Sequence, residues 1–224
     1  MAKSRVRSQV ETYQKQLLAH GDHPTSLFQT LETQTLRFDH MMQRILETSA
    51  GGFTLHDVGC GLGHLHEYLN KKKVKHRYSG SDIVPEAVAL FHQKFPKLKV
   101  KCADFLSLNT NKKYDFVVCN GILHFPAGTD SSQWRNFGYK LIKHMFTNAK
   151  KGVAFNFLTT YKTTENHSLF YFDPKDVFDF SQKHLSRFVH LDHAYPLYEA
   201  TITVFTKEYM QTRFKQATFK KYFR

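Results

Sequence analysis

Hydrophobic residues follow two different periods along the middle of this chain. Between residues 53 and 158, short apolar runs that end in polar residues alternate with stretches whose apolar residues recur every three or four positions. The runs predict strands and the stretches predict helices. After a first strand that ends in the turn at Gly59, strands are predicted over 78–83, 100–105, 114–121 and 151–158. Helices are predicted over 62–71, 86–94 and 133–149. This alternation is typical of an α/β fold with a parallel sheet.

The first fifty residues have a helical pattern throughout. Residues 4–20 predict a mostly polar helix, and a second helix is predicted to begin near Ser26. Its apolar stripe, which includes Leu27, has a period close to 3.6 residues and ends at a pair of glycines, Gly51 and Gly52. We expect this segment to form a helical lid or cap over the rest of the chain.

The pattern changes again after residue 172. Asp173 and Pro174 are a favourable cap and first residue for a helix, which should continue to about Leu185. Two alternating segments then predict an antiparallel hairpin at the sheet edge, over 188–192 and 199–207. The last residues are basic and aromatic, and either a helix or a loose tail fits them. The expected parts of the chain are a helical lid over 1–50, a main domain over 51–210 and a basic tail over 211–224.

The most informative chemistry lies where the first strand ends. Asp57 precedes three evenly spaced glycines, Gly59, Gly61 and Gly63, which lead into a helical pattern. Glycines in such a turn let backbone N–H groups and the start of a helix approach a ligand closely. A dinucleotide site has the different spacing G-x-G-x-x-G. The acid-first turn favours a cofactor that carries an ammonium group and no pyrophosphate.

Polar residues also end the next three strands. Asp82 ends the second strand, Asp104 the third, and Asn120-Gly121 the fourth. Open α/β sheets bind ligands at the carboxyl edge of their strands, where these side chains would meet. A carboxylate at Asp82 can accept both ribose hydroxyls of a nucleoside. The structural alternatives are that Asp82 caps the helix that starts near Pro85 and that Asp57 is a capping carboxylate.

The order of these motifs resembles the Rossmann-like (class I) S-adenosylmethionine-dependent methyltransferases. The resemblance is close over about residues 50–160 and holds in outline beyond them. It implies a mostly parallel seven-stranded sheet with helices on both faces and an antiparallel C-terminal hairpin whose last strand is inserted against the rest. It also implies S-adenosylmethionine as cofactor and S-adenosylhomocysteine as product.

The resemblance assigns a contact with the cofactor to each motif. Asp57 would orient the loop amides or, through water, hold the methionyl ammonium. Asp82 would accept the ribose hydroxyls, and Ile83 would pack on the adenine. Asp104 would accept the exocyclic amine of adenine, with Phe105 nearby. The expected cofactor-binding residues are Arg37, Asp57, Gly59, Cys60, Gly61, Asp82, Ile83, Ala103, Asp104, Phe105, Asn120 and Gly121.

Four of the expected site residues lie nearer the reacting end of the cofactor. Asn120 and Gly121 would offer backbone carbonyls to the methionyl amine. Arg37, on the second predicted helix, would clamp the cofactor's carboxylate, as a basic residue does in related small-molecule methyltransferases; an exposed arginine is the alternative. His124 is the expected catalytic residue, because a histidine beside the acceptor can remove its proton. With fourteen histidines in the chain, a chance placement is the alternative.

The expected reaction is direct SN2 transfer of the sulfonium methyl to an oxygen or nitrogen of a small-molecule acceptor, with an anionic metabolite among the candidates. Asn120-Gly121-Ile122-Leu123 departs from the Asn/Asp-Pro-Pro-aromatic pattern, which disfavours base-amino and glutamine acceptors. The alternatives are an RNA-modifying methyltransferase that uses a basic surface and a non-catalytic, cofactor-binding partner subunit. Transfer or cyclisation of the aminocarboxypropyl arm is also compatible with these residues. Residues 159–172 would complete a lid over the acceptor.

Composition limits the picture further. The chain has 224 residues, 41% of them hydrophobic, and a net charge of +13. We expect one domain with a full core, no membrane span, no secretory signal and a cytoplasmic location. Cys60, Cys102 and Cys119 form no CxxC pair, so buried free thiols and no metal site are expected. The positive charge indicates either a plain basic surface or an anionic partner.

Overall fold

The computed structural model describes residues 2–49, 51–108 and 114–223, with side chains from residue 6 onward. Met1 and Ala50 of the predicted lid segment and Arg224 of the predicted tail lie outside the described residues. The helices are α1 (Ala2–His20), α2 (Leu31–Thr48), α3 (His64–Lys71), α4 (Pro85–Lys94), α5 (Ser131–Asn148), α6 (Pro174–His184) and α7 (Lys207–Arg213). The strands are β1 (Phe53–Val58), β2 (His76–Asp82), β3 (Lys99–Cys102), β4 (Tyr114–Cys119), β5 (Ala149–Thr159), β6 (Tyr171–Phe172), β7 (Val189–Asp192) and β8 (Glu199–Phe205).

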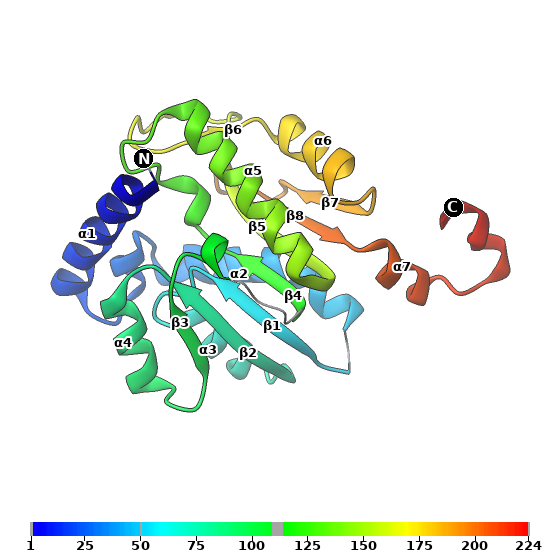
Figure 1. Ribbon diagram of the computed structural model, residues 1–224, viewed down its shortest axis with the longest axis horizontal. Helices are drawn as coiled ribbons and strands as arrows, with labels where there is room; N and C mark the ends of the chain where they lie inside the picture. Colours follow the sequence, from blue (N-terminus) through cyan, green and yellow to red (C-terminus); the bar gives the residue numbers. More distant parts are fainter. Residues whose placement is uncertain (1, 50, 109–113, 224) are drawn as a thin grey trace.

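One mixed sheet runs through the molecule in the order β3-β2-β1-β4-β5-β8-β7 (Figure 1). β1 to β5 pair in parallel, and β8 is antiparallel to both neighbours, β5 and β7. This confirms the predicted fold, including the inserted last strand. The short strand β6 pairs with the end of β5 and was not predicted, because two residues are too few to show a period.

Helices cover both faces of the sheet, and each face has its own hydrophobic core. On one face, α5 and α6 pack on the sheet through residues such as Trp134 and Val177. On the other face, α2, α3, α4 and α7 pack around residues such as Met42, Phe91 and Phe116. Apolar residues recur along these helices at the spacing of one buried face, which is why the sequence pattern located them.

The predicted second helix is wrong at its start. Pro24–Leu27 form a short 3₁₀ helix, η1, and Phe28 adopts the left-handed conformation with φ of 56°. The helix α2 begins only after Thr30, whose side chain accepts a hydrogen bond from the backbone N–H of Thr33. The hydroxyl of Thr33 in turn accepts from the backbone N–H of Thr30, so a reciprocal capping box sets the boundary. Leu27 therefore lies outside α2 and lines the cavity described below.

The start of α6 agrees with the sequence prediction, whereas one of the three cysteines does not. Asp173 caps α6 as predicted, accepting from the backbone N–H of Lys175 at 2.8 Å. The predicted tail holds the end of α7 and a 3₁₀ segment, η4 (Ala217–Phe223). Cys60 and Cys119 are buried, but Cys102 is exposed at the end of β3, a short edge strand, so the prediction of burial is wrong for that thiol. Among the residues described, no helix is long and apolar enough to cross a membrane.

Candidate active site

A cavity of about 490 Å³ lies at the carboxyl edge of the sheet. Its size is in the usual range for small-molecule sites. α1, η1 and α2 contribute to its wall, together with the loop between β5 and β6. The structure brings every predicted site residue into this one cavity, namely Arg37, Asp57, Gly59, Cys60, Gly61, Asp82, Ile83, Ala103, Asp104, Phe105, Asn120, Gly121 and His124.

The turn after β1 requires its glycines. Gly59 and Gly63 have φ of +74° and +84°, a region that side chains disfavour. A Cβ on Gly59 would lie 2.6 Å from the side chain of Ile122, and one on Gly63 would lie 2.7 Å from the ring of Phe91. The backbone N–H of Gly59 donates to the carbonyl of Ser81 at 2.7 Å. The turn is therefore held tightly against the end of β2, with its backbone at the cavity.

Asp82 accepts two backbone hydrogen bonds where β2 ends, but it is not the cap of α4, whose N-cap residue is Val84. Asp82 Oδ2 accepts from the backbone N–H of Gly61 at 2.8 Å, and its Oδ1 accepts from the N–H of Val84, at the start of α4, at 2.9 Å. Burial raises the pKa of this carboxyl, against the lowering effect of those amides. Each carboxylate oxygen has a further lone pair, so Asp82 has acceptor capacity left for a ligand.

Asp57 is a buried acid in the wall of the same cavity. Its Oδ2 accepts from the hydroxyl of Tyr78 at 2.6 Å. Burial raises the pKa of Asp57 to about 7, and the nearby charge of Asp82 contributes to the increase. The hydrogen bond from Tyr78 acts in the opposite direction. Asp57 therefore exchanges its proton near neutral pH.

The residues expected around adenine all line the cavity, and Phe105 also belongs to the hydrophobic core. Asp104 lines the cavity, and its Oδ1 accepts from the backbone N–H of Leu106 at 3.0 Å. The ring of Phe105 stacks on the ring of His56 with centroids 4.9 Å apart and is almost fully buried. Ile83 is half-buried and lines the cavity. The packing of Phe105 fixes the backbone at this end of the site.

Hydrogen bonds with three other segments fix the backbone of the segment that ends at His124. His124 ends the short 3₁₀ segment η3 (Ile122–His124), which starts at Gly121 with φ of +82°. The indole N–H of Trp134 donates to the carbonyl of Leu123 at 3.1 Å, and the N–H of Phe170 donates to the carbonyl of His124 at 2.8 Å. The N–H of Gly121 donates to Asn156 Oδ1 at 2.8 Å. Burial lowers the pKa of His124, so its imidazole is neutral at pH 7.

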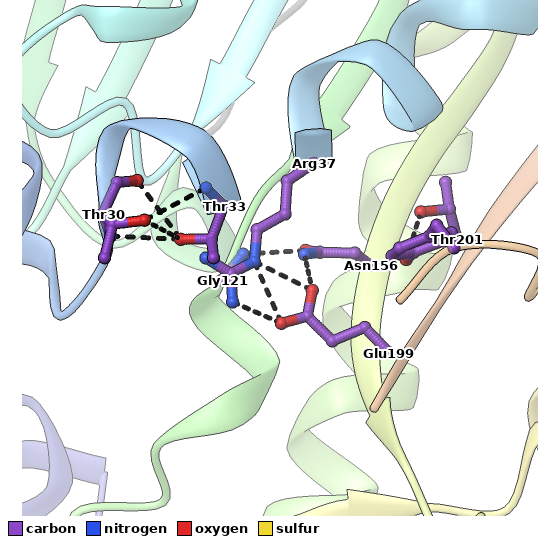
Figure 2. Close-up of polar contacts among 8 residues, drawn as sticks. Thr30, Thr33, Arg37, Gly121, Asn156, Glu199 and Thr201 are labelled. Atoms are coloured by element: carbon purple, nitrogen blue, oxygen red, sulfur yellow. Dashed lines mark hydrogen bonds and ion pairs between the residues drawn. The ribbon is translucent and has the colours of Figure 1, made fainter. Parts of the chain in front are cut away.

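Arg37 is not the exposed arginine that was the alternative for it. Its Nε lies 2.9 Å from both carboxylate oxygens of Glu199, and its Nη2 lies 2.5 Å from one of them (Figure 2). The side chain of Arg37 is 12% exposed and that of Glu199 is 1% exposed. A guanidinium held in this two-pronged way has a fixed orientation.

Several buried polar atoms of the cavity wall have no hydrogen-bond partner within the described part of the chain. They are Gln29 Oε1, Arg37 Nη1, Asn120 Oδ1 and His124 Nε2. Buried polar groups are rarely left unpaired in proteins, so this wall fits a ligand that carries both donors and acceptors. A cationic donor and amide acceptors together fit the carboxylate and ammonium of a zwitterion.

Sequence reasoning missed three polar residues near this wall. Asn156 interrupts an apolar strand pattern, which was a usable signal of a buried polar role, whereas Glu199 is the first residue of β8 and interrupts no such pattern. Gln29 lies in the irregular segment between η1 and α2 and carried no sequence signal. Glu199 and Gln29 become recognisable as wall residues only when β8 and the segment before α2 are brought to the cavity.

Comparisons with known proteins agree with this site. The chain matches a family described as a methyltransferase domain over residues 56–138. It is 31% identical over 159 residues to the putative methyltransferase Rv1506c of Mycobacterium tuberculosis (strain ATCC 25618 / H37Rv), covering 70% of this chain and 95% of the relative.

Solved structures share the fold at lower identity. One is 1,6-didemethyltoxoflavin-N1-methyltransferase from Burkholderia thailandensis, with a TM-score of 0.63, 13% identity and coverage of 92% of this chain and 88% of that one. Another is the N-methyltransferase NodS from Bradyrhizobium japonicum WM9, with a TM-score of 0.57, 16% identity and coverage of 88% and 96%. The chain belongs to the Rossmann-like (class I) S-adenosylmethionine-dependent methyltransferase family.

Proposed function

We propose that this chain transfers a methyl group from S-adenosylmethionine to an oxygen or nitrogen of a small-molecule acceptor that lies beside His124. The observation that carries the proposal is the continuity of the cavity, which is lined by Asp82 and the glycine turn as well as by His124. When bound, S-adenosylmethionine supplies a methyl group on a positively charged sulfur, and the protein then mainly has to orient the reactants.

The residues present fit the cofactor along its whole length. Asp82 would accept the ribose hydroxyls with its remaining lone pairs, and Ile83 would pack on the adenine. Arg37 Nη1 would donate to the cofactor's carboxylate, and the oxygen atoms at Asn120 would accept from its ammonium. Each of these residues lines the cavity, and Arg37 Nη1 and Asn120 Oδ1 are among the buried atoms without a partner in the described part of the chain.

His124 would accept the acceptor's proton at Nε2. Its imidazole is neutral because burial lowers its pKa, so Nε2 has a lone pair available at pH 7. The side chain of Gln9 on α1 donates to the carbonyl of Phe125 at 3.2 Å, which ties α1 to the loop beside His124. We infer that α1 and η1 act as the lid over the acceptor and exclude water from it.

The acceptor is a compact and mostly apolar molecule with an O–H or N–H group. Its end of the cavity is lined by apolar side chains, including Phe125, Phe137 and Leu169. Of the described residues in the wall, Arg37 is the one lysine or arginine, and Glu199 already binds it. A neutral acceptor therefore fits better than an anionic one. The structural neighbour from Burkholderia thailandensis holds 1,6-didemethyltoxoflavin, a small molecule, which is consistent with this class.

The test is to incubate the protein with methyl-labelled S-adenosylmethionine and three separated fractions of a cell extract: small molecules, RNA and protein. We expect label only in the small-molecule fraction. His124→Asn should remove the transfer and leave S-adenosylhomocysteine binding intact. Label in RNA would support the RNA-modifying alternative that the net charge of +13 raises. Cofactor binding without label in any fraction would contradict the proposed reaction.

A further inference from the structure

A single buried carboxylate joins four elements around the cavity. Glu199, the first residue of β8, binds the guanidinium of Arg37 on α2. Its Oε2 also accepts from the side-chain amide of Asn156 on β5 at 2.8 Å. Asn156 Oδ1 then accepts from the backbone N–H of Gly121, just after β4, at 2.8 Å. Figure 2 shows the three side chains converging, with Glu199 between Arg37 and Asn156.

Burying the charged carboxylate of Glu199 costs free energy. Glu199 is about 1% exposed and Asn156 is fully buried. Removing a charge from water costs several kcal/mol even when it is paired, and an apolar residue of similar size often stabilises a fold equally well. Burial raises the pKa of the Glu199 carboxyl, but its interactions with His124, Arg37 and Asn156 together lower that pKa below its usual value, which favours the charged form. Fold stability alone does not explain its presence.

Both branches of the network end at groups that line the cavity. Along one branch, Glu199 uses Nε and Nη2 of Arg37, which leaves Nη1 as the buried nitrogen without a partner in the described structure. Along the other branch, Asn156 fixes the N–H of Gly121, directly after Asn120, whose Oδ1 is also buried and unpartnered there. Glu199 thus holds Arg37, a possible donor to a carboxylate, directly, and it holds the turn with Asn120, a possible acceptor for an ammonium, through Asn156.

We propose that Glu199 is a positioning residue for the zwitterionic arm of the cofactor: it touches neither end of the arm but orients Arg37 toward the carboxylate and, through Asn156, the Asn120-Gly121 turn toward the ammonium. This inference rests on the proposed cofactor site. It assigns binding of the adenosine part to Asp82 and the glycine turn, which Glu199 does not contact. Loss of Glu199 therefore weakens one half of the ligand selectively.

The competing explanation is a structural clamp between α2 and the sheet. A clamp would affect the folding of the whole cavity, and every ligand would lose affinity in parallel. The two explanations differ for 5′-methylthioadenosine, which has the adenosine part of S-adenosylhomocysteine but lacks its amino-acid arm. Only the positioning role predicts that the two ligands respond differently to a change at Glu199.

The experiment measures the affinity of both ligands by calorimetry for the unmodified protein and for Glu199→Gln. The amide keeps the shape of the side chain but replaces one accepting oxygen with an NH2 donor, which would face a donor of Arg37 or Asn156. We expect S-adenosylhomocysteine to bind at least tenfold more weakly and 5′-methylthioadenosine to change less than twofold. Glu199→Asp keeps the charge that pairs with Arg37, which protects folding, but shortens the side chain by one methylene. It should also weaken S-adenosylhomocysteine binding more than 5′-methylthioadenosine binding.

Val204→Ala provides a matched control, because Val204 is a fully buried core residue of β8 outside the cavity wall. It should lower the melting temperature without changing the ratio of the two affinities. Equal losses for both ligands in the Glu199 variants, or no loss, would overturn the positioning role while the cofactor site stands. Failure of the unmodified protein to bind S-adenosylhomocysteine would overturn the cofactor site as well.

Discussion

We predict that Asp57 makes cofactor binding depend on pH. Its carboxyl is buried, which raises its pKa to about 7, with Asp82 adding to the effect. The cofactor's ammonium is expected to favour the ionised form of this carboxyl. Binding below pH 7 must therefore remove the proton, whereas binding above pH 7 finds the carboxylate already formed. Affinity for S-adenosylhomocysteine should rise with pH through this range.

The size of the effect follows from the pKa. A carboxyl with a pKa of about 7 is about one-tenth ionised at pH 6 and about nine-tenths ionised at pH 8, so affinity should fall about tenfold from pH 8 to pH 6. Stability is linked to the same group with the opposite sign. Because folding raises the pKa of Asp57 from 3.8, the folded state loses stability as pH rises from about 4 to about 7, up to about 4 kcal/mol.

Asp57→Asn removes both effects, since an asparagine keeps an acceptor for the hydroxyl of Tyr78 but does not titrate. Calorimetric titration at pH 6, 7 and 8, in two buffers of different ionisation enthalpy, measures affinity and the protons released on binding. The variant should bind with little pH dependence, and its stability gain over the unmodified protein should be larger at pH 8 than at pH 4. An unchanged pH dependence in Asp57→Asn would refute the reasoning.

Three further predictions test other parts of the site and fold. Asp82→Asn should weaken S-adenosylhomocysteine binding about 100-fold, because hydrogen bonds to a charged acceptor contribute about 1.5–3 kcal/mol each. The control is Asp130→Asn, a change at the helix cap of α5 outside the cavity wall. A loss of affinity below threefold for Asp82→Asn would contradict the ribose role. Gly63→Ala should lower the free energy of unfolding by about 2 kcal/mol in a denaturant titration, since its Cβ would meet Phe91 at a positive φ, and should cost more than Gly21→Ala, which has open space. Cys102 should react with a thiol reagent in the native protein before the buried Cys60 and Cys119, and rapid modification of all three would argue against the observed burial.

Regular elements could be predicted because their periods report which face is buried. Asp173 and Pro174 located the start of α6, and the glycine turn located the end of β1. The start of α2 was predicted wrongly because Leu27 has helical spacing with the residues that follow, while the capping box at Thr30 determines the boundary. Local hydrogen bonds of this kind override a periodic pattern at the ends of helices.

The predicted site residues line one cavity because parallel pairing brings the ends of neighbouring strands to the same edge. Glu199 could not be placed in this way. It reaches the cavity because β8 is inserted beside β5, with Glu199 opposite Leu158, and its ion-pair partner Arg37 is 162 residues away along the chain. A pairing over that distance depends on the tertiary fold and leaves no periodic trace.

The cavity wall and the whole chain differ in the sign of their charge. The chain has a net charge of +13, whereas the described wall holds more carboxylates than lysine and arginine side chains. These carboxylates are Asp57, Asp82 and Asp104 in the proposed cofactor site and Glu199, which is bound to Arg37. Such a wall favours the sulfonium form of the cofactor, which carries one positive charge more than the product, and it disfavours an anionic acceptor. Transfer of the methyl group removes that charge and weakens the attraction, which favours release of the product. The chemistry of the cavity wall is therefore a better guide to the acceptor than the net charge of the chain.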